Sequence, residues 1–384
     1  MYKERLMEII KLSLWGNGTA VVDRDTYEEM KQQTIATLPS YCLASLDIVP
    51  ELRKEWKSYI IHQMFYIMQC NSEQDALPIS VPYVILKGTS AAMYYPHPDC
   101  RMMGDIDIMT RREDLDTACQ ELMEHGYRVE KYLNREISMV RDQVTVELHR
   151  RFATLNDPDK AKYLDDLIIN NITPSHVLPD IVNGLVLLEH LDQHMEGGIG
   201  LRQIIDWMMF VEKCLPDDKW PEFESYVDRI GLKKLAIVTT RMCELYLGLP
   251  HRVWCSQADE LLCEQLMDYV LSSGNFGNKK TTDTDISENV FMLASTPKLA
   301  FKLLQKQGQH NWKAAQKHKI LRPLAWIYQL FRYVSKGLKR ENAISKMKAE
   351  YTAAKERSAM FDALGVNTDI NGTVIYKDGQ YVKE

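Results

Sequence analysis

The 384-residue sequence has no apolar run long enough to cross a membrane. A membrane-spanning helix needs roughly 18 or more uncharged apolar residues, and no stretch of the chain approaches that length. The first twelve residues, MYKERLMEIIKL, carry five charges and lack the uninterrupted apolar centre of a secretory signal. We therefore expect a soluble, cytoplasmic protein without a leader.

The eight cysteines form no C-x-x-C pair and show no zinc-ligand spacing. We interpret them as reduced thiols, which agrees with a cytoplasmic location. Internal repeats and low-complexity tracts are also absent. Hydrophobic residues make up 45% of the chain and charged residues 26%, which is typical of a globular protein, and the length suits two or three domains.

The net charge of −6 conceals one basic region. Residues 298–348 contain 13 Lys or Arg and a single acid, Glu341, so the rest of the chain carries 34 bases and 52 acids. The region also contains tryptophan, tyrosine and phenylalanine, a composition that could meet nucleic acid or an anionic membrane surface. The alternative is a set of solvated helix faces whose aromatic residues lie in a core.

Hydrophobic periodicity predicts helices at both ends of the chain and strands between them. The expected helices are 2–13, 25–38, 50–70, 89–96, 112–126, 179–196, 198–213, 233–247, 256–272 and 321–338. The expected strands are 83–87, 104–110, 127–133, 136–140 and 144–149, and residues 371–382 contain the Asp-Gly signature of a hairpin. We predict an α+β fold in four segments: a helical 1–75, a mixed-sheet core 76–150, a helical 151–364 and a hairpin or tail 365–384.

Two acids stand one residue apart in the apolar stretch GDIDIMT. Because side chains alternate across a strand, Asp105 and Asp107 point to one face and repel each other. A divalent cation such as Mg²⁺ between them would relieve that repulsion. Glu147, in VELH, has the parity to join them. The simpler alternatives are capping acids at a strand end and an exposed face of an edge strand.

A possible phosphate site precedes the two acids, in the sequence KGTS. Gly88 lets the backbone approach a ligand, and the start of the following helix offers free N–H groups to an anion. The hydroxyls of Thr89 and Ser90 and the charge of Lys87 would add to it, although Lys87 could simply extend from the strand into solvent. Carboxylates that hold Mg²⁺ beside such a turn are typical of phosphoryl-type transfer.

In their order, ILKGTSAA, GDIDI and VELH resemble the nucleotidyltransferase superfamily with the polymerase β-like fold. Residues 83–150 are more closely similar to a family of bacterial proteins described as uncharacterised nucleotidyltransferases, and a fainter similarity continues through 187–207. The resemblance implies that Asp105, Asp107 and Glu147 carry catalytic Mg²⁺ or Mn²⁺. The sequence departs from the usual pattern in its Gly-Thr-Ser turn and in having Glu rather than Asp as the third acid.

The resemblance also implies that Gly88 with Thr89 or Ser90 holds the nucleoside triphosphate. Lys87, Arg101 and Gly104 are further candidates for nucleotide binding. The charge of Arg101 could neutralise a triphosphate, and an ordinary surface arginine is the alternative. His149, two residues after the third acid, is expected to order the strand end or contact substrate rather than bind metal.

A polar group on two later helices has no settled role in the sequence. His190 and His194 are four residues apart, a spacing that can bind zinc, but no glutamate follows the first histidine as in a zinc protease. A contribution of His194, Arg202 and Asp206 to acceptor or nucleotide binding is one hypothesis. A buried His–Asp or Arg–Asp pair between helices is the other.

These features predict transfer of a nucleoside monophosphate from an NTP to a hydroxyl or phosphate on a small molecule, a glycan precursor or a protein. One alternative is a catalytically silent nucleotide- or ligand-binding module. Another is an RNA-directed enzyme that uses 298–348. The acidic remainder of the chain disfavours a long nucleic acid, whereas peripheral membrane contact through the basic region stays open.

Overall fold

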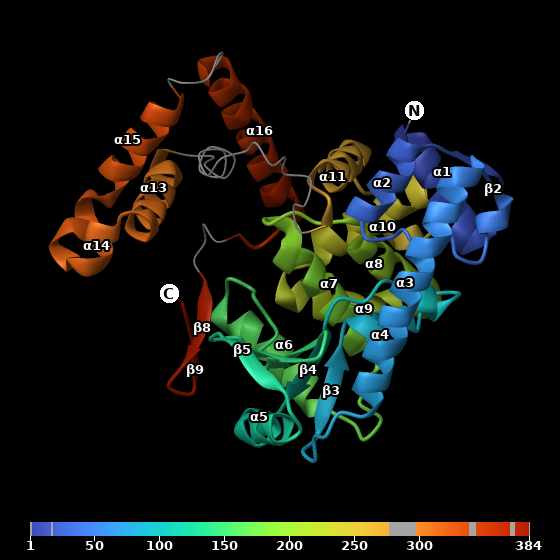
Figure 1. Ribbon diagram of the computed structural model, residues 1–384, viewed down its shortest axis with the longest axis horizontal. Coiled ribbons are helices and arrows are strands. Elements are labelled where there is room, and N and C mark those ends of the chain that lie inside the picture. The colour runs from blue at the N-terminus through green and yellow to red at the C-terminus, as the bar shows by residue number, and fades with distance from the viewer. Residues whose placement is uncertain (1, 17, 276–296, 338–342, 369–372, 384) are drawn as a thin grey trace. The chain divides into compact units, whose positions relative to one another are not determined.

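The computed structural model describes residues 2–16, 18–275, 297–337, 343–368 and 373–383 (Figure 1). The chain divides into two compact units. Unit 1 comprises Met1–Lys279 and Gly365–Glu384, and unit 2 comprises Lys280–Leu364. The predicted sheet core and the helices that flank it in sequence thus share unit 1, while the four-segment division of the chain remains a prediction.

A five-stranded mixed sheet forms the centre of unit 1, so the predicted α+β class is confirmed. Its strands, in spatial order, are β3 (Tyr83–Leu86), β4 (Ile106–Thr110), β7 (Val144–His149), β6 (Glu136–Arg141) and β5 (Arg128–Tyr132). The central pair, β4 and β7, is parallel, and every other neighbouring pair is antiparallel. All five strands match predicted ones to within a few residues at their ends.

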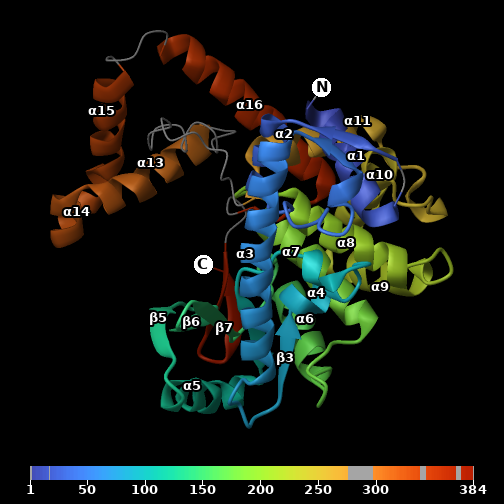
Figure 2. The same ribbon diagram turned by 45° about the vertical axis from the view of Figure 1, so that its right-hand side comes forward.

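One face of this sheet is apolar and is covered by two helices. Ile106, Ile108, Val146 and Leu148 pack there against residues of α3 (Pro50–Asp75) and α5 (Leu115–Glu124). Figure 2 shows α3 running past the sheet as the longest helix of the unit. Because strand side chains alternate, the polar residues between these apolar ones point to the opposite face.

The remaining helices of unit 1 come from both sides of the sheet in sequence. On the N-terminal side are α1 (Tyr2–Trp15), α2 (Arg24–Gln32) and a small parallel pair, β1 (Ala20–Val22) and β2 (Leu46–Ile48), which the sequence analysis did not predict. The turn after β3 continues into the short α4 (Gly88–Ala92). On the C-terminal side are α6 (Pro158–Asn170), α7 (Asp180–Met195), α8 (Leu201–Cys214), α9 (Trp220–Ile230), α10 (Lys233–Leu247) and α11 (Glu260–Ser273).

The C-terminal hairpin is confirmed and belongs to unit 1. Strands β8 (Val374–Lys377) and β9 (Gln380–Lys383) are joined by Asp378 and Gly379, which both have positive φ, as a tight hairpin turn requires. The Tyr381 hydroxyl donates a hydrogen bond to Asp165 of α6. The hairpin is therefore tied to the helix that follows the sheet.

Unit 2 is helical in its described parts. It contains α13 (Pro297–Asn311), α14 (Lys313–Lys317), the 3₁₀ helix η6 (Lys319–Leu324), α15 (Ala325–Gly337) and α16 (Ala343–Leu364). The basic region 298–348 falls here, with 338–342 outside the described residues. Within the described chain, no helix combines the length and apolarity needed to cross a membrane.

Several predicted helix ends were wrong, and local backbone explains two of them. The helix expected over 25–38 ends at Gln32, because Thr34 adopts a positive φ of 53° that no right-handed helix can continue. The helix expected from 256 begins at Glu260, where the Asp259 side chain accepts a hydrogen bond from the Leu261 N–H as an N-cap.

Candidate active site

The turn between β3 and α4 is conformationally unusual. Lys87 has φ +51°, which is rare for a residue with a side chain, and Gly88 follows with φ +41°. A Cβ atom on Gly88 would lie 3.2 Å from the Cε of Met103. Strained backbone of this kind persists only where the surrounding structure holds it, and it clusters at functional sites.

The predicted carboxylates come together through strand pairing. Asp107 of β4 lies directly opposite Glu147 of β7 in the parallel register, although 39 residues separate them in sequence. Both point away from the apolar core, and Asp107 is almost fully buried. Asp105 lies just before β4 and lines the same cavity.

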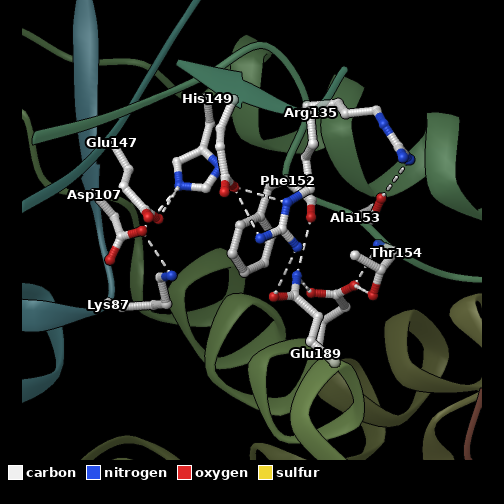
Figure 3. A network of polar contacts seen from close by, with 12 residues as sticks. Lys87, Asp107, Arg135, Glu147, His149, Phe152, Ala153, Thr154 and Glu189 are labelled. Carbon is white, nitrogen blue, oxygen red and sulfur yellow. Dashed lines mark hydrogen bonds and ion pairs between the residues drawn. The ribbon is translucent and has the colours of Figure 1, made fainter. Parts of the chain in front are cut away.

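His149 completes the cluster. Its Nε2 atom lies 2.8 Å from Oδ1 of Asp107 and 3.8 Å from Oε2 of Glu147 (Figure 3). One ligand atom from each of Asp107, Glu147 and His149 lies within 4.8 Å of the others, so the three could hold a metal ion. The sequence analysis assigned His149 to ordering or substrate contact, and the structure places it among the candidate ligands.

Lys87 contacts the cluster directly. Its Nζ atom lies 2.7 Å from Oδ1 of Asp107, and both side chains are buried. Burial alone would lower the pKa of Lys87, but the negative charges of Asp107 and Asp105 outweigh it and raise the pKa. Burial would likewise raise the pKa of Asp107, but Lys87 and His149 lower it. The Lys87–Asp107 pair is therefore charged on both sides.

The other two carboxylates are short of positive charge. Burial, followed by the charges of Asp107 and Asp105, raises the pKa of Glu147 to about 8. The charge of Asp107, followed by burial, raises the pKa of Asp105. A divalent cation would relieve this repulsion, and hard carboxylate oxygens are the ligands of Mg²⁺ and Mn²⁺. The carboxylates present therefore fit such an ion.

The cluster opens into a cavity of about 220 Å³. The residues that line it are Lys87, Gly88, Arg101, Gly104, Asp105, Asp107, Arg135, Glu136, Glu147, His190, His194 and Arg202. Pockets that enclose a whole small molecule measure roughly 300–1,000 Å³. The cavity is thus of a size for a phosphate group with its cation, and a larger ligand would extend beyond it.

Two of the predicted nucleotide-binding residues do not line this cavity. The Thr89 hydroxyl donates a hydrogen bond of 2.8 Å to Oε1 of Gln74, and the Ser90 hydroxyl donates one of 2.9 Å to the carbonyl of Ile85. These bonds tie the turn to α3 and to the end of β3. The hydroxyls thus hold the turn in place.

Arg101 lines the cavity, but its guanidinium is engaged elsewhere. Its Nε and Nη2 atoms donate to the two carboxylate oxygens of Asp206 at 2.8 and 2.7 Å, and the Tyr95 hydroxyl donates to the same carboxylate. Arg101 and Asp206 are both buried. Asp206 therefore forms a buried Arg–Asp pair, but its partner is Arg101, which lies outside the helical group in which such a pair was expected.

Helices α7 and α8 supply another wall of the cavity. The rings of His190 and His194 meet edge to face at 4.7 Å, and the Nη1 atom of Arg202 donates to the carbonyl of Met102 at 3.3 Å. Burial, followed by the charge of Lys87, lowers the pKa of His194 to about 3. His194 is therefore neutral at physiological pH.

Three charged residues in the polar network that extends from His149 were not predicted from the sequence. Oε2 of Glu136 lies 3.5 Å from its Nδ1 atom and 2.8 Å from Nη2 of Arg135, which also lines the cavity. Glu189 of α7 is fully buried and accepts hydrogen bonds from the N–H and hydroxyl of Thr154 (Figure 3). Glu136 stands opposite His149 in the β6–β7 register, so its parity along the predicted strand 136–140 was a usable signal.

The mixed sheet thus places a glycine turn beside carboxylates on paired strands. The chain belongs to the uncharacterised nucleotidyltransferase family, whose model matches residues 24–248, and this membership implies transferase activity. The match runs from α2 to α10 and so includes helices on both sides of the predicted 76–150 core. No curated protein and no solved structure matches the chain.

Proposed function

We propose that this protein transfers a nucleoside monophosphate from an NTP to a hydroxyl or phosphate acceptor with the help of Mg²⁺ or Mn²⁺. The observation that carries the proposal is the register of Asp107 with Glu147, which gathers acids beside the strained Lys87–Gly88 turn. Family membership supports the reaction class.

The cation would be held by Asp105, Asp107 and Glu147, with His149 as a further ligand. When bound, it supplies positive charge to the triphosphate and lowers the pKa of an acceptor hydroxyl. The protein itself contributes position and electrostatics. The buried carboxylates would determine where the cation binds. Glu147 would face the acceptor.

The phosphate tail would lie against Gly88 and Gly104, which both line the cavity. Lys87 precedes Gly88 in the same turn and also lines the cavity, and in the proposed complex it would also face a phosphate oxygen. Arg135 and Arg202 line the same cavity and add positive charge. Thr89 and Ser90 would act by holding the turn, since their hydroxyls are bonded to protein atoms.

The acceptor would enter along the wall formed by His190 and His194. Both side chains are largely buried, and burial lowers the pKa of each, so the wall is neutral. A small molecule, a glycan precursor or a protein hydroxyl fits such a wall better than a long polyanion. Unit 1 also contains most of the acidic residues of the chain.

The test is incubation with α-labelled NTPs and Mg²⁺ or Mn²⁺ against a metabolite or lysate pool. Label transfer should occur with the native protein and be lost in the D105N/D107N variant. Asp116→Asn, which alters an exposed acid of α5, is the matched control and should retain activity. Transfer that survives the double substitution refutes the proposal, and transfer of γ-label would indicate a kinase.

One observation favours a second candidate, a catalytically silent binding module. Lys87 already supplies a positive charge at Oδ1 of Asp107, as a permanent substitute for a cation would. Titration with Mn²⁺, followed by its paramagnetic resonance signal, separates the two. A silent module of this kind binds no Mn²⁺ in the cluster, whereas the transferase binds it and loses it in D107N.

A further inference from the structure

The helical hairpin of unit 2 formed by α13, η6 and α15 has a polar interior. The Asn311 side chain donates to Oε1 of Gln329 at 3.1 Å, and Gln329 is fully buried. Gln305 accepts a hydrogen bond of 3.1 Å from the N–H of Trp326. Side-chain amides therefore help to hold the two helices together, beside the ring contact of Phe301 with Trp326, whose centroids lie 5.6 Å apart.

The helices also approach each other at small residues. A Cβ atom on Gly308 would lie only 2.0 Å from the carbonyl oxygen of Ala325, so no larger residue fits there. Ala315 and Ala325 are fully buried as well. Small residues and interhelical side-chain hydrogen bonds are how helices associate where the surroundings are apolar and burial of large side chains gives no advantage.

The large apolar side chains of this hairpin are exposed. Ile320 is 88% exposed, Phe331 71%, and Leu324 49%. Leu324, the last residue of η6, lies four residues before Tyr328 of α15, and Phe331 follows three residues later. This spacing places the three side chains along one stripe. Ala325 and Gln329, which are buried, lie on a different face.

Only positive charge accompanies this exposed apolar surface. Residues 297–332 contain no Asp or Glu. The exposed bases are Lys302, Lys306, Lys313, Lys317, Lys319 and Arg322. Trp312 stacks on Tyr328 with ring centroids 5.3 Å apart, which adds amphipathic aromatic rings at the same end of α15.

We propose that this hairpin docks on an anionic lipid surface, with Ile320, Leu324 and Phe331 inserted among the acyl chains. Amphipathic helices of this composition lie in the interface with their apolar side chains buried about 5–10 Å deep. The basic residues contact the headgroups, each contributing on the order of 1 kcal/mol. Exposed aliphatic side chains argue against nucleic acid, which offers them no apolar partner, and the uniform positive charge opposes a second copy of the same face. The inference does not depend on the proposed catalytic activity.

The experiment is flotation of the full-length protein with vesicles of phosphatidylcholine alone or mixed equally with phosphatidylglycerol. Binding is expected to be at least about tenfold stronger to the anionic vesicles. Phe331→Ser and the charge reversal K317E/K319E should each weaken that binding by about tenfold or more. D105N/D107N should leave it unchanged.

Matched controls come from exposed residues of unit 1. Phe65 is 67% exposed on α3, so Phe65→Ser removes a comparable ring, and K57E/K234E reverses two exposed lysines. Both controls should bind like the native protein, and thermal unfolding checks that every variant is folded. Equal affinity for the two vesicle types, or binding that the unit 2 variants leave unchanged, overturns the proposal. Absence of binding to either vesicle type also overturns it. Binding to RNA, or self-association that Phe331→Ser abolishes, would then identify the other occupant of this surface.

Discussion

The Nζ atom of Lys87 lies 2.7 Å from Oδ1 of Asp107, and only 9% and 3% of the two side chains are exposed. His149 contacts the same oxygen from another direction at 2.8 Å. One oxygen therefore receives two donors before any ligand arrives. A cation at Asp107 must share this carboxylate with Lys87 or displace it.

The first prediction is that Lys87→Met destabilises the protein by about 3–5 kcal/mol, because it leaves the Asp107 carboxylate buried without its counter-ion. Saturating Mn²⁺ should reduce the difference in free energy of unfolding between the variant and the native protein, because the ion neutralises Asp107 in place of Lys87. Urea unfolding with and without Mn²⁺ measures both effects, with exposed Lys57→Met as the control. A deficit that Mn²⁺ leaves unchanged would speak against a cation at Asp107.

The second prediction concerns the two glycines of the cavity. Gly88→Ala should cost roughly 1–2 kcal/mol, because Gly88 has φ +41° and a new Cβ would press on Met103. A Cβ atom on Gly104 would have no atom within 4 Å, so Gly104→Ala should change the free energy of unfolding little and is the matched control for stability. If both line the phosphate site as proposed, NTP affinity should fall in both variants, as measured by equilibrium dialysis. If neither variant changes the NTP affinity, neither the Lys87–Gly88 turn nor Gly104 is part of the binding site.

The third prediction separates structure from ligand contact at Arg101. Removing either partner of the Arg101–Asp206 pair should cost about 3–5 kcal/mol, whereas R101M/D206M should recover most of that loss, because no buried charge is left alone. If Arg101 serves only to pair with Asp206, the double variant keeps its NTP affinity. If R101M/D206M is stable but still binds NTP more weakly than the native protein, Arg101 contacts the triphosphate.

The fourth prediction is a pH dependence that originates at Glu189. Burial raises the pKa of this side chain to about 8 from an ordinary value near 4.5. Between these two pH values the folded state retains a proton that the unfolded chain has lost. The contribution of the Glu189 proton to the free energy of unfolding is therefore full below about pH 4.5 and is lost as the pH rises to about 8. In Glu189→Gln the free energy of unfolding should therefore fall less over this pH range, by an amount on the order of a few kcal/mol.

Urea unfolding across that pH interval tests the fourth prediction. Exposed Glu130→Gln is the control and should leave the profile unchanged. An E189Q profile that falls as steeply as the native one would show that other buried acids, such as Asp192, dominate the decline.

Local pattern was enough to predict the strands of the core sheet. Period-two alternation in residues 104–110 and 144–149 indicated which side chains share a face, and Asp107 and Glu147 do point to the same face. The strand order and the parallel pairing of β4 with β7 depend on contacts between distant segments. Three-residue strands such as β1 and β2 are too short to show any periodicity.

The partners of the polar residues were harder to predict than their positions. A lysine after a strand suggests phosphate contact or solvent exposure, and nothing local indicates that Lys87 will turn inward to Asp107. Arg101 and Asp206 are 105 residues apart, so only the packed fold brings them together. Glu136 could have been found from strand parity, whereas Glu189 sits on a helix among apolar residues and gave no such signal.

The parallel pairing of β4 and β7 also has a consequence for assembly of the molecule. Parallel neighbours cannot be joined by a tight turn, and the chain passes through α5, β5 and β6 between Asp107 and Glu147. No short fragment of the chain contains even a weak version of the cluster. Acquisition of ion affinity during refolding should therefore report the pairing of β4 with β7, and would serve as a probe of native topology.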